Sequence, residues 1–258
     1  MSLNLPPRSA LLACWTTAWL TGEASLTDLA ERVTAHDDGH TVTGLWVDDL
    51  ELEQGVARLR AEGVTRVRLV LPAPGDPLGL PGPGAFTSAA LAAGEGVLAL
   101  REDGTGYGLV PALTSHGSEL DGTVTTVQWA THVVAVTGPD QGPFLQEAEH
   151  DLRIGIMEAA RAMADLDVAR WNPEIGDALD DLRRQNRRGI DEDELPASWP
   201  ARARDVLVRS RQLASLISLA QQDVGGSIDA READARDKVL RDLAKVVRRA
   251  RVAAYNAA

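Results

Sequence analysis

The chain has 258 residues, of which 44% are hydrophobic and 25% charged, a composition typical of folded globular proteins and not of disordered ones. Its formal net charge of −12 at pH 7 makes nucleic acid an unlikely partner, because phosphate binding needs a positive field. Cys14 is the only cysteine, which excludes an intrachain disulfide and a cysteine-based zinc site.

The basic residues are almost all arginine. Only Lys238 and Lys245 are lysines among the 26 basic residues. Together with the many Ala and Gly residues, this bias indicates a GC-rich bacterial genome. Individual arginines are therefore weak evidence of a functional site.

The first predicted element is a buried helix over residues 10–20. The apolar run overlaps a secretory segment in length, and residues 11–14 imitate a lipoprotein box. It is too short to cross a bilayer, and it continues past Cys14. We expect Leu11, Trp15 and Trp19 on one face of a core helix, and neither a membrane anchor nor a processed leader.

The next helix begins at a recognisable signal. Ser25 and Asp28 have the spacing of a capping box, and the helix is expected to run to about His36.

Residues 41–71 predict a strand–helix–strand unit. Its strands are 41–47 and 64–71, and Asp48–Asp49 is the expected cap of the helix between them. Such a unit has parallel strands.

The second of these strands alternates in character. Arg66 and Arg68 share one face, and the apolar residues between and after them share the other. A strand covered on both faces would be continuously apolar. We therefore expect an edge strand, or one covered on one face, in a two-layer mixed sheet.

A loop and a hairpin follow. Residues 72–84 combine prolines and glycines, which neither a helix nor a sheet tolerates. A short helix is expected at 85–93, and then a hairpin of 96–101 with 106–111. Residues 115–118 are expected in a loop, and 123–136 in a strand with a bulge or break near Ala130.

The second half of the chain predicts helices alone. Four stretches have apolar residues every three to four positions: 144–171, 173–189, 198–224 and 229–250. Short turns favour antiparallel neighbours, so an up-and-down four-helix bundle is expected. Packing of these helices on the first half, or on a second subunit, fits the pattern too.

The predicted fold class is therefore α+β. It consists of an N-terminal mixed α/β layer with a small sheet over residues 1–140 and a C-terminal antiparallel four-helix bundle over residues 141–258.

One candidate ligand site follows from the predicted sheet. Ligands bind beyond the carboxyl ends of parallel strands, where Asp48, Asp49 and Asp76 would lie beside the loop 72–84. Such a site would hold a cation or a polar ligand. The same residues also fit structural roles, as a helix cap and a turn residue.

These patterns leave the function unknown, with two hypotheses. The first is a non-catalytic, soluble, cytoplasmic interaction or regulatory protein that self-associates through helices as a homodimer, with a further protein partner left open. It would use no cofactor, no metal and no membrane, because no nucleophile–base set, metal cluster or phosphate loop stands in the sequence. The alternative is an enzyme or small-ligand or cation-binding protein acting at Asp48, Asp49 and Asp76.

Overall fold

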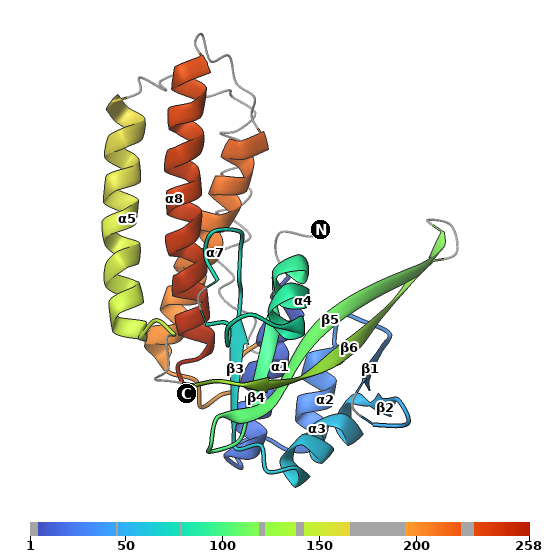
Figure 1. Cartoon of the computed structure of the whole chain (residues 1–258). Helices are drawn as coiled ribbons and strands as arrows, with labels where there is room; N and C mark the ends of the chain where they lie inside the picture. Colours follow the sequence, from blue (N-terminus) through green and yellow to red (C-terminus); the bar gives the residue numbers. More distant parts are fainter. Residues whose placement is uncertain are drawn as a thin grey trace. The chain divides into compact units, whose positions relative to one another are not determined.

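The chain has an α+β fold in the computed structural model (Figure 1). The structure describes residues 5–44, 46–77, 79–118, 122–137, 142–165, 194–222 and 230–258. Over these residues it contains seven helices and one six-stranded mixed sheet.

The helices are α1 (Arg8–Leu20), α2 (Leu26–Thr34), α3 (Leu52–Ala61), α4 (Ala85–Ala93), α5 (Leu145–Asp165), α7 (Ala201–Gln222) and α8 (Ala230–Tyr255). The strands are β1 (Gly39–Thr43), β2 (Leu50–Glu51), β3 (Arg66–Val70), β4 (Gly96–Leu100), β5 (Thr105–Ser118) and β6 (Gly122–Ala135).

The chain divides into two compact units. The N-terminal unit comprises residues 6–142 together with 192–199, and the C-terminal unit comprises residues 1–5, 143–191 and 200–257. The predicted division into an N-terminal domain over residues 1–140 and a helical bundle domain over residues 141–258 stays a prediction.

The sheet has the strand order β2-β1-β6-β5-β4-β3. β1 runs parallel to β6, and all the other neighbouring strands are antiparallel. The predicted strand–helix–strand unit over 41–71 is therefore wrong, because β1 and β3 are separated by three strands and run in opposite directions. The sequence pattern showed the helix between the two strands, but it did not show that the strands lying between β1 and β3 come from residues 96–135.

The first strand is shorter than expected, and its helix is capped differently. β1 ends at Thr43, and residues 50 and 51 pair with it as β2. α3 therefore starts at Leu52, with Glu51 at its N-cap and no side-chain cap. Asp48 and Asp49 precede β2, so the predicted cap at these two residues is wrong.

The capping box of α2 is confirmed. The Ser25 side chain accepts a hydrogen bond from the Asp28 backbone N–H at 3.0 Å, and the Asp28 carboxylate accepts one from the Ser25 N–H at 2.9 Å. The helix ends at Thr34, close to the expected position.

The predicted hairpin of 96–101 with 106–111 is confirmed as β4–β5, but β5 is much longer than predicted and also forms a hairpin with β6. Its pairing is continuous from Thr105–Ala135 to Ser118–Gly122. Residues 115–118 are thus strand and not loop, and β6 has no break at Ala130. Each strand supplies the other with hydrogen-bonding partners over its full length. The Ser, Thr and Gly residues at 114–118 are therefore in extended strand, although such residues are common in turns.

Helices cover both faces of the sheet. Phe86 and Ala90 of α4 pack against Leu98, Leu100 and other residues on one face. The opposite face carries Val42, against which α3 packs at Gly55. The predicted two-layer arrangement is therefore wrong, because helices form a layer on each side of the sheet.

β3 is an edge strand, as expected, but it is covered on both faces. Arg68 lies on the α4 face and is buried, while Arg66 is exposed. The prediction that this strand is covered on one face only is wrong at Arg68, because α4 lies on the arginine side of the sheet.

In the C-terminal unit, α8 packs against both α5 and α7 (Figure 1). α7 and α8 are antiparallel, because Arg211 reaches Tyr255 and Arg236 reaches the carbonyl of Ala220. The α5–α8 contact is close at Gly155, where a Cβ would lie 3.4 Å from Val246. The predicted helix 173–189 lies outside the described residues.

Some of the regularly spaced apolar positions in the predicted helices 144–171, 198–224 and 229–250 are fully buried, and others, such as Leu145, Leu213 and Leu243, are half-buried. The fully buried members are Leu152, Ala203, Val206, Ser210, Ile217, Leu240, Val247 and Ala250. Among the described helices, none combines the length and hydropathy needed to cross a membrane.

Candidate functional site

The structure separates the three predicted site residues. Asp48 and Asp49 are exposed in the segment between β1 and β2, whereas Asp76 is buried in the loop after β3. Asp76 closes a small bridge with Ala73, in which each backbone N–H donates to the other residue's carbonyl.

The strand ends that precede these residues are far apart. Thr43 pairs with Ala130, Ala130 with Val110, and the last residue of β3 pairs with the first of β4. Four strand spacings separate the two ends, which is about 19 Å. Beyond these two strand ends the chain continues in opposite directions, because β1 and β3 are antiparallel. The structure therefore does not bring Asp48 and Asp49 together with Asp76, and ligand binding by any of them stays a prediction.

A buried polar network lies elsewhere in the N-terminal unit. Arg8, at the start of α1, donates two hydrogen bonds to Asp37, of 2.8 and 2.6 Å. The Asp37 carboxylate lies 3.1 Å from Nε2 of His40 on β1. Trp129 Nε1 on β6 lies 3.2 Å from His40 Nδ1. Asp37, His40 and Trp129 have nearly fully buried side chains.

The hydrogen bonds define the proton positions on His40. The indole N–H of Trp129 can only donate, so Nδ1 of His40 accepts and carries no proton. Nε2–H then donates to Asp37. The imidazole is neutral in this arrangement.

Burial and hydrogen bonding shift the pKa values of this network. Burial lowers the pKa of His40, and this outweighs the hydrogen bond with Asp37. Burial alone would raise the pKa of Asp37, but the hydrogen bonds from Arg8 and His40 lower it overall. Both groups therefore favour their unprotonated forms in the folded protein.

This network joins α1, the turn between α2 and β1, β1 itself and β6. The polar atoms of His40 are used internally, so the arrangement is suited to holding the fold together. Among the described residues, no group of three or more His, Cys, Asp or Glu side chains could hold a metal ion.

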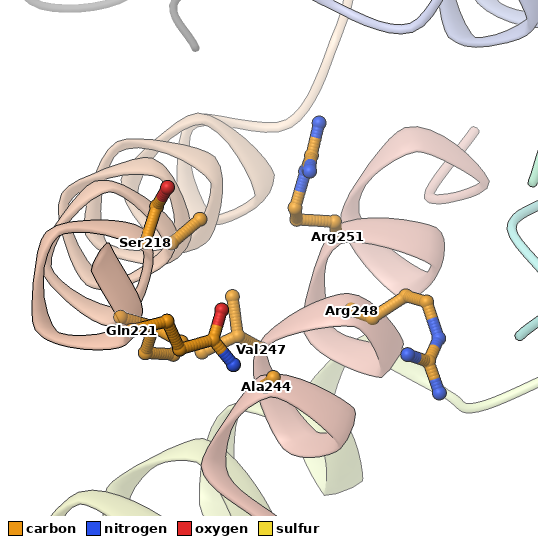
Figure 2. A pocket seen from close by; sticks show the side chains of 8 residues that line it. Ser218, Gln221, Ala244, Val247, Arg248 and Arg251 are labelled. Carbon is orange, nitrogen blue, oxygen red and sulfur yellow. The ribbon is translucent and has the colours of Figure 1, made fainter. Parts of the chain in front are cut away.

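The C-terminal unit contains an open groove of about 250 Å³ between α7 and α8. Its apolar lining comes from Ala214, Ile217, Ala244 and Val247. Its polar lining comes from Ser218, Gln221, Arg248 and Arg251. Figure 2 shows Ser218 and Gln221 on one helix and the two arginines on the other.

Sequence reasoning missed both features. His40 stands alone in a β-branched segment, and no spacing rule connects it with Arg8 or Trp129. The groove residues were partly predicted, since Ile217 and Val247 are regularly spaced apolar residues of the predicted helices 198–224 and 229–250. The arginines of the groove could not be singled out from the sequence, because the pattern does not show how two helices pack.

Two protein-family models match the chain. The Rv1486c-like protein N-terminal domain matches residues 9–143, and the Rv1486c-like protein C-terminal domain matches residues 146–252.

Similar full-length proteins occur in mycobacteria. The uncharacterized proteins MT1533 and Rv1486c of two Mycobacterium tuberculosis strains (CDC 1551 / Oshkosh and H37Rv) are 29% and 28% identical to this chain. The uncharacterized protein ML1804 of Mycobacterium leprae is 27% identical. Each match covers 96% of both chains. No solved structure matches the chain significantly.

Proposed function

The chain belongs to the Rv1486c-like protein family, and we propose that it is a non-catalytic interaction protein that self-associates through the helices of its C-terminal unit. The names of its relatives state no activity. The support therefore comes from the surface of this chain.

The groove between α7 and α8 is the observation that carries the proposal. Small and branched apolar side chains line it at helical spacing on both helices, at residues 214 and 217 and at residues 244 and 247. An apolar channel between two antiparallel helices accepts the apolar face of a third helix. We propose that a helix of a second copy binds there.

Charge supports a second copy as the occupant. Arg248 and Arg251 give the groove two cationic groups, while the chain as a whole carries a net charge of −12. A helix from an identical chain can bring carboxylates to these guanidinium groups, which would fix its orientation in the groove.

Two finer assignments belong to the same proposal. Residues 173–189 are proposed as the remaining helix of an antiparallel four-helix bundle, and the cytoplasm as the location of the protein. Both rest on the sequence pattern. A ligand site formed jointly by Asp48, Asp49 and Asp76 gains no support from their separation.

Sedimentation velocity of Ala244→Lys tests the proposed helical interface. Ala244 is half-buried in the groove, and a lysine there places a charge and a long side chain where the partner helix would pack. We expect the dimer dissociation constant to rise at least about tenfold, as for a central interface residue.

Ala235→Lys is the matched control. Ala235 is also half-buried on α8, but it does not line the groove. It should leave the dissociation constant within about twofold of the wild-type value, and circular dichroism checks that both variants keep their helices. A wild-type chain that is monomeric across micromolar concentrations would contradict the proposal.

A further inference from the structure

The hairpin β5–β6 extends beyond the strands that flank it. β4 pairs with β5 only as far as Leu109, and β1 pairs with β6 only from Thr126 onward. Beyond these points the two strands pair with each other, apart from hydrogen bonds between Thr125 and Asp38 on the β1 side, and Figure 1 shows them reaching away from the rest of the sheet. We call residues 111–118 and 122–125 the arm.

The arm has an unpaired main-chain edge. Thr105 directs its carbonyl to Arg101 on the β4 side, while Gly104 directs its carbonyl to Val136 on the β6 side. The main-chain N–H and C=O groups of successive residues point alternately to the two edges of a strand. Leu113 and Ser115, like Thr105, therefore point these groups to the β4 side. No strand among the described residues pairs with that side of the arm.

The arm lacks the features that normally protect such an edge. Neither β5 nor β6 contains a single Asp, Glu, Lys or Arg, although 25% of the chain is charged. The pairing has no bulge, and the residues of β5 from Ala112 to Gly117 are exposed. Pro111 interrupts the edge only at its base. Exposed edges usually carry charges, prolines or bulges that prevent pairing with another chain.

We propose that this edge of β5 pairs antiparallel with the same edge of a second copy. A strand edge is self-complementary in the antiparallel direction, so two identical edges can exchange hydrogen bonds about a two-fold axis. Two chains of net charge −12 repel each other, and the strand residues of the arm add no charged side chains to this contact. This surface lies in the N-terminal unit and is independent of the proposed helical interface.

The length of the edge sets the register. Its outward-facing residues run from Pro111 to Gly117, and Thr114 is their midpoint. A two-fold axis at Thr114 pairs Leu113 of one copy with Ser115 of the other, which gives about four main-chain hydrogen bonds. Leu113, which is 48% exposed, gains a neighbour in this arrangement. The contact is small, so we expect a dissociation constant in the micromolar range.

Cysteine cross-linking of the full chain tests the register. Thr114→Cys places the two thiols on the axis, where the Cα atoms of a non-hydrogen-bonded pair lie about 4.5 Å apart, within disulfide range. Thr126→Cys is the matched control, because Thr126 is exposed and directly opposite Thr114 in the hairpin. Its two copies would lie about 14 Å apart, which is too far.

With oxidised glutathione as the oxidant, Thr114→Cys should form a covalent dimer at least about tenfold faster than Thr126→Cys. The native Cys14 is buried and serves as the shared background. Equal rates for the two variants would overturn the proposal.

Sedimentation of proline variants tests the edge itself. Ser115→Pro removes an outward N–H from the β5 edge, whereas Thr123→Pro removes one from the opposite edge of the arm. Ser115→Pro should weaken self-association of an Ala244→Lys chain at least about tenfold, and Thr123→Pro should leave it unchanged. Equal association of the two variants would overturn the arm proposal. The helical interface is tested separately by the Ala244→Lys chain itself.

Discussion

At the scale of single residues, His40 is buried with both of its ring nitrogens hydrogen-bonded. It accepts from Trp129 on one nitrogen and donates to Asp37 with the other. Protonation of Nδ1 would place two N–H groups against each other in a buried site. The folded protein therefore disfavours the imidazolium form.

His40 makes stability dependent on pH. Its pKa is lowered in the folded state, so the unfolded state binds more protons below about pH 6.5. The free energy of unfolding should fall as the pH drops from about 6.5 toward the folded-state pKa. Asp37, whose pKa is also lowered, adds a further loss below about pH 4.

His40→Gln should remove the first of these two losses. Glutamine keeps one donor and one acceptor but lacks the imidazole ring, so it replaces the two hydrogen bonds imperfectly, and we expect a loss of about 1–3 kcal/mol at pH 7. Urea unfolding at pH 7 and pH 5.5 should show a smaller difference between the two pH values than in the wild type. An unchanged difference would show that His40 does not titrate in this range.

Gly55 is required by close packing between α3 and β1. A Cβ at this position would lie 2.5 Å from Cγ2 and 2.8 Å from Cβ of Val42. Gly55→Ala should therefore destabilise the protein by about 1–3 kcal/mol, although alanine favours a helix over glycine. Val42→Ala in the same chain should recover part of this loss, and a double-mutant cycle from denaturant unfolding measures the coupling. Additive effects of the two substitutions would contradict this packing argument.

At the scale of elements, the capping box of α2 predicts a measurable contribution. Ser25→Ala removes the acceptor for the Asp28 N–H and should cost about 1 kcal/mol of unfolding free energy. Ser25→Thr keeps the hydroxyl and should cost less. Chemical denaturation of both variants checks the order, and equal losses would exclude capping as the cause.

Elements defined by local signals could be predicted from the sequence. The capping box at Ser25, the Gly-terminated helix α3 and the short helix α4 all depend on residues within one or two turns. The lengths of β1, β5 and β6 could not be predicted in the same way. Each strand continues for as long as a partner pairs with it, and these partners are distant in sequence.

The separation of the three candidate site residues could not be predicted for the same reason. The pattern correctly indicated a strand before Asp48 and another before Asp76. It did not show that β6, β5 and β4 lie between these strands. Conversely, the buried network at His40 depends on residues 8, 37 and 129, which no local pattern connects.

At the scale of the whole molecule, a short segment after residue 193 belongs to the N-terminal unit. Leu195 and Trp199 are buried, with 1% and 4% exposed surface. Trp15 of α1 donates to the carbonyl of Glu194 at 3.2 Å, and Ser198 donates to Glu23 at 2.6 Å. Residues 194–199 therefore belong to the N-terminal unit, although in the sequence they follow α5 of the C-terminal unit.

Leu195→Ala should accordingly destabilise the N-terminal unit. Truncation of a fully buried leucine costs about 2–5 kcal/mol. Hydrogen exchange of the full chain should show faster exchange in α1 than in the wild type. Ala197→Ser, at an exposed position of the same segment, is the matched control and should change exchange in α1 much less. Unchanged exchange in Leu195→Ala would contradict this assignment.

This segment has a consequence for synthesis on the ribosome. The chain emerges from its N-terminus, so α1 and the sheet leave the exit tunnel well before residues 194–199. Until translation passes Trp199, the indole N–H of Trp15 lacks its carbonyl partner, and the nascent N-terminal half keeps apolar surface uncovered. Vectorial folding of this half should therefore finish late, during elongation of the C-terminal helices.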